Sequence, residues 1–389
     1  MPEPVPTLNS VVHPSSRRAF VRFIAGGAAL SLAGTTLVAC GGSTLASNTP
    51  ASSPHATTAK TIAKSSAAVG SSTGSTVDVD KAKKEGTVQL YTSLDTKIVD
   101  DVIKGFKDKY GIDVQYYRAT PAQITGKVLQ EADAGKVQAD IVDASDVGAF
   151  LVLKKRGILR PYDSPASQAV AANLRDPDGT WVADRLTQVV IQYNTSLVKA
   201  APKHWKDLAD QQYAGKLAFS ASSAGDSAPR LYTLAKAFGY DLLQSYATLK
   251  PLRLDTPQLV TQAIENGERW ATFDMNDNIA QRSKLQGKST EYLFPDEGVP
   301  TEPGAIGLIK DSAHPTAAAL FFDWWMGKEG QKILVDGGKY SSRSDLDPPK
   351  GNPPLSQLKL LVLDYNEYQA NRSDILERMT KIFGGEWGV

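Results

Sequence analysis

The chain has 389 residues, with 43 Lys and Arg against 42 Asp and Glu, and it contains one cysteine. The length suits two domains, and 41% hydrophobic with 22% charged residues is a globular composition. A formal net charge of +1 gives no electrostatic support for a nucleic-acid binder. One cysteine excludes an intrachain disulfide and any site built from several thiolates, and four histidines disfavour a histidine-rich zinc centre.

Residues 1–39 have the pattern of an export signal. Arg17 and Arg18 precede a modestly apolar stretch rich in Ala and Gly, which resembles a twin-arginine signal. The alternative is a transmembrane anchor, but Gly, Ala, Ser and Thr favour insertion less than Leu, Ile or Val. Leu37-Val38-Ala39-Cys40 resembles the bacterial lipoprotein box, in which the cysteine is lipidated and becomes the mature N-terminus. We therefore predict lipidation of Cys40 and anchoring to the bacterial cell membrane.

Residues 40–77 predict a flexible tether. Ser, Thr, Gly and Ala dominate this tract, and it has too few large apolar side chains to offset the entropy of ordering it. A tether of this kind holds a domain away from a lipid surface. The remaining function classes are then a solute receptor, a secreted enzyme, an adhesin or an envelope factor.

From Asp78 onward, strand and helix patterns alternate. Short apolar runs predict strands at 87–91, 112–117 and 140–143, and periodic apolar positions predict helices at 98–110 and 121–134. Such units form parallel sheets, and ligands bind outside the carboxyl ends of the strands. The rule gives five candidate ligand residues: Thr92, Ser93, Asp95, Ser145 and Asp146.

The middle of the chain repeats this pattern, with strands predicted at 186–193, 216–220 and 271–274. Ser222 and Ser223 precede a helix predicted at 228–238, where free backbone N–H groups form an anion cradle. The alternative is that a serine only caps this helix. Asp274, Asp277 and Asn278 follow the last strand as further ligand candidates, although Asp and Asn also stabilise turns unaided.

Several segments resemble the extracellular solute-binding proteins of bacterial ABC importers, in the ferric-iron-binding-like branch. The resemblance covers residues 85–350 and rests on the order of its motifs rather than on any one of them. The matching segments are Gly86–Tyr91, Gln138–Val142, Lys155–Leu159, Ile191–Thr195, Pro202–Leu208 with Tyr213–Lys216, Pro303–Lys310 and Phe321–Gln331.

The resemblance implies an α/β, two-lobed periplasmic-binding-protein-like fold of type II. Each lobe is a mixed, mostly parallel sheet flanked by helices, and two crossing strands, expected at 189–195 and 305–310, join the lobes. Lobe 1 would comprise 78–190 with 305–350, and lobe 2 would comprise 191–304. Residues 351–389 would form a helical segment packing on a lobe. The family further implies a monomer that closes around a small solute or ion and delivers it to an ABC permease.

The departures from the family concern the solute. Ferric receptors of this branch carry adjacent tyrosines where this chain has 274–278, and a histidine ligand where it has Leu94-Asp95-Thr96. Hydroxyl groups with Arg185 suit a phosphate, a phosphonate or a small organic anion, whereas the aspartates favour a cationic part. A zwitterion or a metal–anion complex satisfies both, so the presence of a metal stays open.

We predict no cofactor and no enzymatic activity. The chain lacks a Gly-x-Ser-x-Gly elbow and a His-Glu-x-x-His pair, which disfavours a secreted hydrolase. A sensory or adhesion lipoprotein on the same fold is the other alternative.

Overall fold

The computed structural model describes residues 77–221 and 227–387. The chain divides into two units, Met1–Ala68 and Val69–Val389, and every described residue belongs to the second. The predicted export signal, Cys40, the tether up to residue 76, Ser222 and Ser223 therefore lie outside the described residues. Within the described part of the chain, no helix combines the length and the apolar character that crossing a membrane requires.

The first lobe is built around three parallel strands in the order β2-β1-β3. A helix follows each strand, as the alternating pattern predicts, and Gly111 ends α2 in the left-handed conformation with φ 69°. The elements are β1 (Val88–Thr92), α2 (Thr96–Tyr110), β2 (Val114–Arg118), α3 (Pro121–Asp133), β3 (Ile141–Ala144) and α4 (Val147–Lys155).

The second lobe is built around β6, which pairs in parallel with β7 on one side and β8 on the other. Helices again connect the strands, so the carboxyl ends of these strands lie on one edge of the sheet. The elements are β6 (Leu217–Ser220), α5 (Ser227–Phe238), α6 (Tyr240–Thr248), β7 (Leu252–Leu254), α7 (Pro257–Glu265), β8 (Ala271–Asn276), α8 (Asp277–Leu285) and β9 (Thr290–Leu293).

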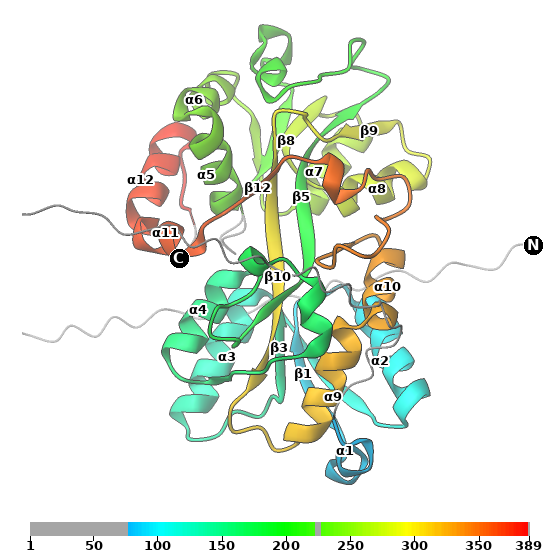
Figure 1. The fold of residues 1–389 in the computed structure, drawn as a ribbon. Helices are drawn as coiled ribbons and strands as arrows, with labels where there is room; N and C mark the ends of the chain where they lie inside the picture. Colours follow the sequence, from blue (N-terminus) through cyan, green and yellow to red (C-terminus); the bar gives the residue numbers. More distant parts are fainter. Residues whose placement is uncertain (1–76, 222–226, 388–389) are drawn as a thin grey trace, which may run out of the picture. The chain divides into compact units, whose positions relative to one another are not determined.

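Two long strands, β5 (Val182–Asn194) and β10 (Val299–Ile309), run through both lobes (Figure 1). β5 pairs with β10 up to Gln188 and with β8 from Val189 onward, so the change of lobe falls between these residues. Both predicted crossings, at 189–195 and 305–310, lie beyond this junction, because 189–194 pair with β8 and β9 in the second lobe and 305–308 pair with β3 in the first. The two-lobed α/β fold with two crossing strands is confirmed.

The remaining elements complete both lobes. Helix α12 packs against α5 and α6 of the second lobe, whereas α11 packs against α4 of the first lobe. The C-terminal segment therefore contacts both lobes rather than one. The elements are α1 (Val79–Glu85), β4 (Leu159–Arg160), α9 (Pro315–Met326), α10 (Lys328–Asp336), β11 (Tyr340–Ser341), β12 (Leu360–Val362), α11 (Tyr365–Ala370) and α12 (Arg372–Phe383).

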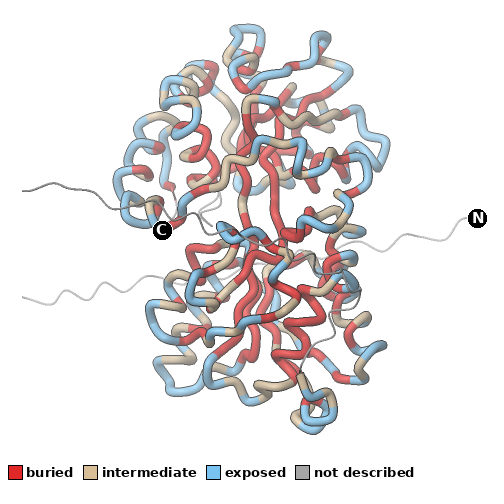
Figure 2. Tube along the Cα trace, in the orientation of Figure 1, coloured by how far each residue is buried: buried red, intermediate tan, exposed pale blue. Residues whose placement is uncertain are grey.

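Burial is concentrated in the strands and on the inner faces of the helices (Figure 2). One apolar cluster lies between the first-lobe sheet and α2 and α9, where Phe106 meets Phe321 edge to face at 4.9 Å. The aromatic run of α9 belongs to this core. A second cluster includes Trp205, Phe219 and Phe273 of the second lobe. The lobes thus have rigid interiors, and the polar strand ends lie between them.

Candidate binding cleft

A cleft of about 780 Å³ lies at the carboxyl ends of strands from both lobes. Its lining includes Ser93 and Ser145, which follow β1 and β3, Arg118, which ends β2, and Asp255 and Asn276 at the ends of β7 and β8. Open α/β sheets place their ligands at this edge, and the volume is that of a small-molecule site. The strand-end rule therefore located the cleft from the sequence.

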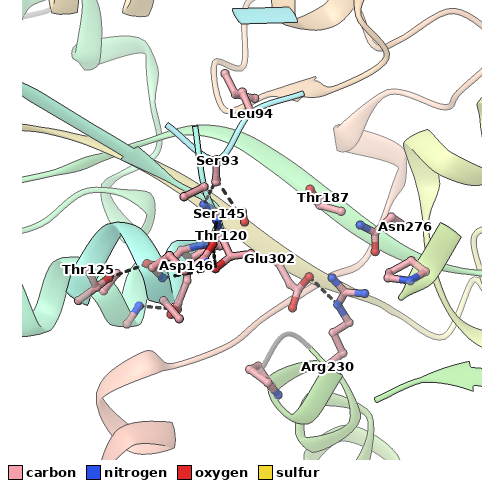
Figure 3. A pocket seen from close by; sticks show the side chains of 18 of the residues that line it. Ser93, Leu94, Thr120, Thr125, Ser145, Asp146, Thr187, Arg230, Asn276 and Glu302 are labelled. Atoms are coloured by element: carbon pink, nitrogen blue, oxygen red, sulfur yellow. Dashed lines mark hydrogen bonds and ion pairs between the residues drawn. The ribbon is translucent and has the colours of Figure 1, made fainter. Parts of the chain in front are cut away.

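Hydroxyl groups form the first-lobe wall of the cleft. Ser93 Oγ accepts a hydrogen bond from the backbone N–H of Ser145 at 2.9 Å and from Arg185 Nη2 at 3.3 Å. Thr120 caps α3 nearby, where its Oγ1 accepts from the N–H of Gln123 at 3.3 Å. These bonds fix the positions of the hydroxyls (Figure 3). The wall offers oriented donors to a ligand.

Five helices begin at the cleft. Residues of the first turns of α3, α4, α7 and α8 line it, as does Asp95 at the N-cap of α2, and each of these helices is at least nine residues long. The N-terminal end of a helix carries partial positive charge, and this field favours an anion. Because five such ends face one cavity, the backbone alone gives the cleft a positive potential.

A buried ionic cluster lies behind the first-lobe wall. Arg185, 2% exposed, donates to the carboxylates of Asp143 and of Asp184, the latter at 2.9 Å. Thr92 Oγ1 also donates to Asp143, at 2.5 Å. Burial raises the pKa of Asp184 to about 6, although Arg185 opposes this rise. The charge of Arg185 is thus already balanced by protein carboxylates, and its contact with Ser93 makes it a support for the wall.

A similar cluster lies behind the second-lobe wall. Ser220 donates to Asp274 from its Oγ at 2.6 Å and from its backbone N–H at 3.1 Å. Arg230 reaches Asp274 at 3.5 Å and donates from Nε to Glu302 at 2.7 Å (Figure 3). Burial raises the pKa of Asp274, and Arg230 and Ser220 oppose this rise. Both Arg230 and Glu302 line the cleft, so this cluster reaches the cleft surface.

Besides Arg372 of α12, three further cations line the cleft: Arg118, Arg282 and Lys339. Among residues 77–221 and 227–387, no carboxylate lies within ion-pair distance of these three. Arg118 donates to the backbone oxygen of Leu94, at 2.6 Å. Burial lowers the pKa of Lys339, Arg185 and Arg282 act in the same direction, and the charges of Asp95 and Asp277 oppose them. Cations that line a cavity without direct ion pairs to protein carboxylates are typical of an anion site.

Two amide side chains of the second lobe also line the cleft. The Oδ1 atoms of Asn276 and Asn278 are buried and have no hydrogen-bond partner among the described residues. A buried carbonyl oxygen without a donor costs free energy unless water or a ligand supplies one. The amides therefore suit a solute that carries hydroxyl or amine hydrogens besides its charged group.

Six of the predicted ligand residues line the cleft. They come from both lobes, and the structure places them in one cavity although up to 185 positions separate them: Ser93, Asp95, Ser145, Asp146, Arg185 and Asn278. Asp146 is partly committed, because its Oδ1 accepts from the N–H of Gly148 at 2.8 Å and caps α4. Contact of these residues with a solute stays a prediction.

The other described candidates, Thr92, Asp274 and Asp277, do not line the cleft. Thr92 and Asp274 are fully buried in the two ionic clusters, where they orient groups that reach the cleft. Asp277, 1% exposed, accepts from the N–H of Gln188 on β5 at 3.1 Å. Burial raises its pKa to about 7, although Lys339 opposes the rise. We correct these three predicted contacts to supporting roles.

The sequence reasoning missed most of the cationic side chains. Arg118 is the last residue of β2 and directly follows the strand predicted at 112–117, so the rule that selected Ser93 and Ser145 would have selected it as well. Arg230 lies in the first turn of α5, after the predicted anion cradle. Arg282 and Lys339 have no sequence signal, because they reach the cleft only through the packing of α8 and the segment after α10.

A metal centre made from familiar ligands is absent from the part of the chain that the structure describes. No group of three or more His, Cys, Asp or Glu side chains there is arranged to hold a metal ion. The two tyrosines in the cleft, Tyr365 and Tyr368, come from α11 and not from the end of β8. Burial raises the pKa of Tyr368 to about 12, so its phenol is neutral near pH 7.

The comparisons with known proteins agree with this architecture. The model of the family described as "Bacterial extracellular solute-binding protein" matches residues 137–371. A relative described as an Fe(3+)-binding periplasmic protein, from Serratia marcescens, is 21% identical over 322 residues, covering 77% of this chain and 91% of that protein.

Solved structures show the same fold. Iron-bound HitA from Pseudomonas aeruginosa has a TM-score of 0.64 and 20% identity, covering 75% of this chain and 99% of that one. The periplasmic binding protein AfuA from Actinobacillus pleuropneumoniae, with fructose-6-phosphate bound, has a TM-score of 0.64 and 20% identity, covering 77% and 98%. At these identities the likeness establishes the fold, and the class of solute has to be inferred from the residues of the cleft.

Proposed function

The chain belongs to the bacterial extracellular solute-binding protein family, and we propose that it captures a small organic anion for an ABC importer. A phosphate ester or a phosphonate that also carries hydroxyl groups fits the cleft best. The protein is then a receptor and not an enzyme, and a membrane permease takes the solute from its closed form.

The observation that carries this proposal is the convergence of positive potential on one cavity. Five helix N-termini and the cations Arg118, Arg282 and Lys339 face the cleft. Hydroxyl groups of Ser93 and Ser145 supply neutral donors beside them. A phosphate group uses both, because it carries negative charge and three strong acceptor oxygens.

A metal–anion complex is the second candidate solute. It is favoured by the carboxylates of Asp95, Asp255 and Glu302 in the cleft and by the iron-related names of several relatives. The tyrosines that line the cleft, Tyr365 and Tyr368, come from α11 and not from the end of β8, which argues against the usual ferric tyrosine pair. A sensory or adhesion role on the same fold differs from import in its partner, which a permease gene beside this one would decide.

We also propose that the mature protein begins at a lipidated Cys40 and stands outside the cytoplasm on a flexible tether. The basis is the motif at Leu37–Cys40 and the composition of 40–77. A Cys40→Ala variant should leave the membrane fraction. If it stays there in the same amount as the unaltered protein, the anchor proposal fails.

Binding is tested by titration calorimetry and thermal shift with the protein purified without refolding. The panel contains inorganic phosphate, a hexose 6-phosphate, an amino-phosphonate, a polyamine and ferric citrate. A solute at 100 times its Kd should stabilise the folded protein by about 2.7 kcal/mol. The proposal predicts a response to phosphorylated solutes that weakens with added salt. A response to the polyamine alone would contradict it.

A further inference from the structure

The C-terminal segment is fixed to the second lobe. Glu367 of α11 accepts a hydrogen bond from the Tyr232 hydroxyl at 3.0 Å and pairs with Lys236, both on α5. After α12, Arg253 donates to the backbone oxygen of Gly384 at 2.7 Å. The ring of Trp387 stacks beside Phe219 of β6 at 6.1 Å. Any movement of the second lobe therefore carries α11 with it.

The same short helix reaches the first lobe. Gln369 lies so close to Gly148 of α4 that a Cβ on this glycine would be 2.6 Å from its Nε2. Tyr365 and Tyr368 are 7% and 4% exposed, and they share one apolar cluster with Phe150 of α4. A six-residue helix is not stable alone, so the packing against both lobes holds α11 in place.

This helix and the start of the next also form one side of the cleft. Tyr365, Tyr368, Gln369 and Arg372 are among the lining residues. Gln369 is exposed there, and Arg372 forms a side-chain hydrogen bond with the Tyr368 hydroxyl. A helix that only covered apolar surface would need neither an amide nor a guanidinium at the cavity.

We propose that α11 is a strap carried by the second lobe, which seats on α4 when the cleft closes and brings Gln369 and Arg372 onto the bound anion. The inference rests on the proposed receptor function and adds solute-selecting residues outside both strand-end walls. The strap links solute contact to lobe closure, because Gln369 of α11 lies against α4 and also lines the cleft, and Arg372 follows it at the start of α12. Gly148 is the position on α4 against which Gln369 packs, and we call it the seat, since a side chain there would occupy the place of Gln369.

The contact with solute is tested by the Arg372→Gln variant, with inorganic phosphate and a hexose 6-phosphate as probes in titration calorimetry. The expected result is a ten- to hundredfold rise in Kd, because the variant loses one charge-assisted hydrogen bond to the anion. Arg378→Gln is the matched control on the same helix, because the Arg378 guanidinium lies over the Tyr240 ring at 4.9 Å and is not part of the cleft lining. The control should bind like the unaltered protein.

The seat is tested by Gly148→Leu alone and combined with Gln369→Ala. Gly148→Leu should raise the Kd tenfold or more, and the double variant should return to the Kd of Gln369→Ala. Chemical unfolding of each variant without solute separates a lost seat from a lost fold. If the unaltered protein binds no phosphorylated probe, the proposed function fails and the strap fails with it. If it binds, and Arg372→Gln and Gly148→Leu bind equally well, only the strap is overturned.

Discussion

The two lobes place similar ionic clusters at the same position in their sheets. In each, an aspartate near the end of a strand accepts from a hydroxyl on the neighbouring strand: Asp143 from Thr92, and Asp274 from Ser220. Each aspartate also meets an arginine. The difference lies in the arginine. Arg185 belongs to the crossing strand β5 and holds two buried carboxylates, whereas Arg230 lies on α5 and pairs with Glu302 at the cleft.

This difference separates support from recognition. Arg185 of the first-lobe cluster pairs with Asp143 and Asp184, so this cluster stabilises the junction of β3 and β5, and it presents the Ser93 hydroxyl and the edge of a neutralised Arg185 to the cleft. In the second-lobe cluster, Arg230 and its partner Glu302 both line the cavity. Substitutions in the first cluster should therefore affect mainly stability, and those in the second should affect binding as well as stability.

The largest expected effect is on stability, from Arg185→Met. It leaves Asp143 and Asp184 buried without their cation, and breaking a buried pair in this way costs about 3–5 kcal/mol of unfolding free energy. Urea unfolding followed by circular dichroism measures the loss. Arg156→Met, at a surface pair with Asp133, is the control and should change stability little. If Arg185→Met is as stable as Arg156→Met, the first-lobe cluster does not have the supporting role that distinguishes it from the second-lobe cluster.

Arg230→Gln should add a loss of affinity to a loss of stability. Loss of one charge-assisted hydrogen bond to the solute, about 2 kcal/mol, corresponds to a Kd roughly thirtyfold higher. Asp274 is fully buried and loses its cation in this variant, so the midpoint of unfolding should fall as well. Calorimetry with the best phosphorylated solute gives the Kd. Unchanged affinity together with a large loss of stability would mean that Arg230 is structural like Arg185.

Asp277 binds the backbone of Gln188 where β5 changes lobe, and its titration gives a test by pH that is independent of both ionic clusters. The folded-state pKa of Asp277 is raised to about 7 by burial, above the ordinary 3.8. Its protonated form is therefore favoured by folding, and the unfolding free energy should fall as pH rises from about 4 to 7. Lys339, Tyr292, Tyr340 and Asn352 are the groups around it.

Asp277→Asn removes this titration and keeps an acceptor for Gln188. The variant should match the unaltered protein near pH 4 and exceed its unfolding free energy by roughly 1 kcal/mol or more at pH 8. Urea unfolding at four pH values between 4 and 8 is sufficient. A constant difference across this range would assign the effect to something other than the carboxyl group.

The smallest expected effect comes from Ser145→Ala on the first-lobe wall. It removes one neutral hydroxyl donor, so the Kd should rise about fivefold. The backbone N–H of Ser145 still donates to Ser93, so the wall should keep its geometry. Calorimetry beside Arg230→Gln tests whether charge or hydroxyl groups dominate recognition. A larger effect from Ser145→Ala would reverse that order.

The sequence predicted the fold and the edge of the sheet that carries the cleft. Strand periodicity placed β1, β3 and β8 within one or two residues, and the strand-end rule then selected Ser93 and Ser145. It could not separate Thr92 from Ser93, because the last residue of a buried strand faces inward and the next one faces the cleft. Asp274 lies inside β8, which is longer than predicted, and Asp277 begins α8 with its carboxylate against the N–H of Gln188, so neither could be assigned from the strand pattern.

Long-range packing determines the rest of the site. Lys339 and Arg282 reach the cleft from segments that carry no ligand motif, and α11 is held by its contacts with α4, α5 and α12. Arg185 looks like an anion partner in the sequence. Only the structure shows that Asp143, 42 positions earlier in the chain, forms an ion pair with Arg185 and neutralises it.

The most direct test of an anion receptor is native mass spectrometry of the protein purified without refolding, followed by calorimetry with the solute it retains. The account predicts one bound phosphorylated or otherwise anionic solute per chain, lost from Arg230→Gln and kept by Arg156→Met. A retained cation or polyamine that survives Arg230→Gln would contradict it.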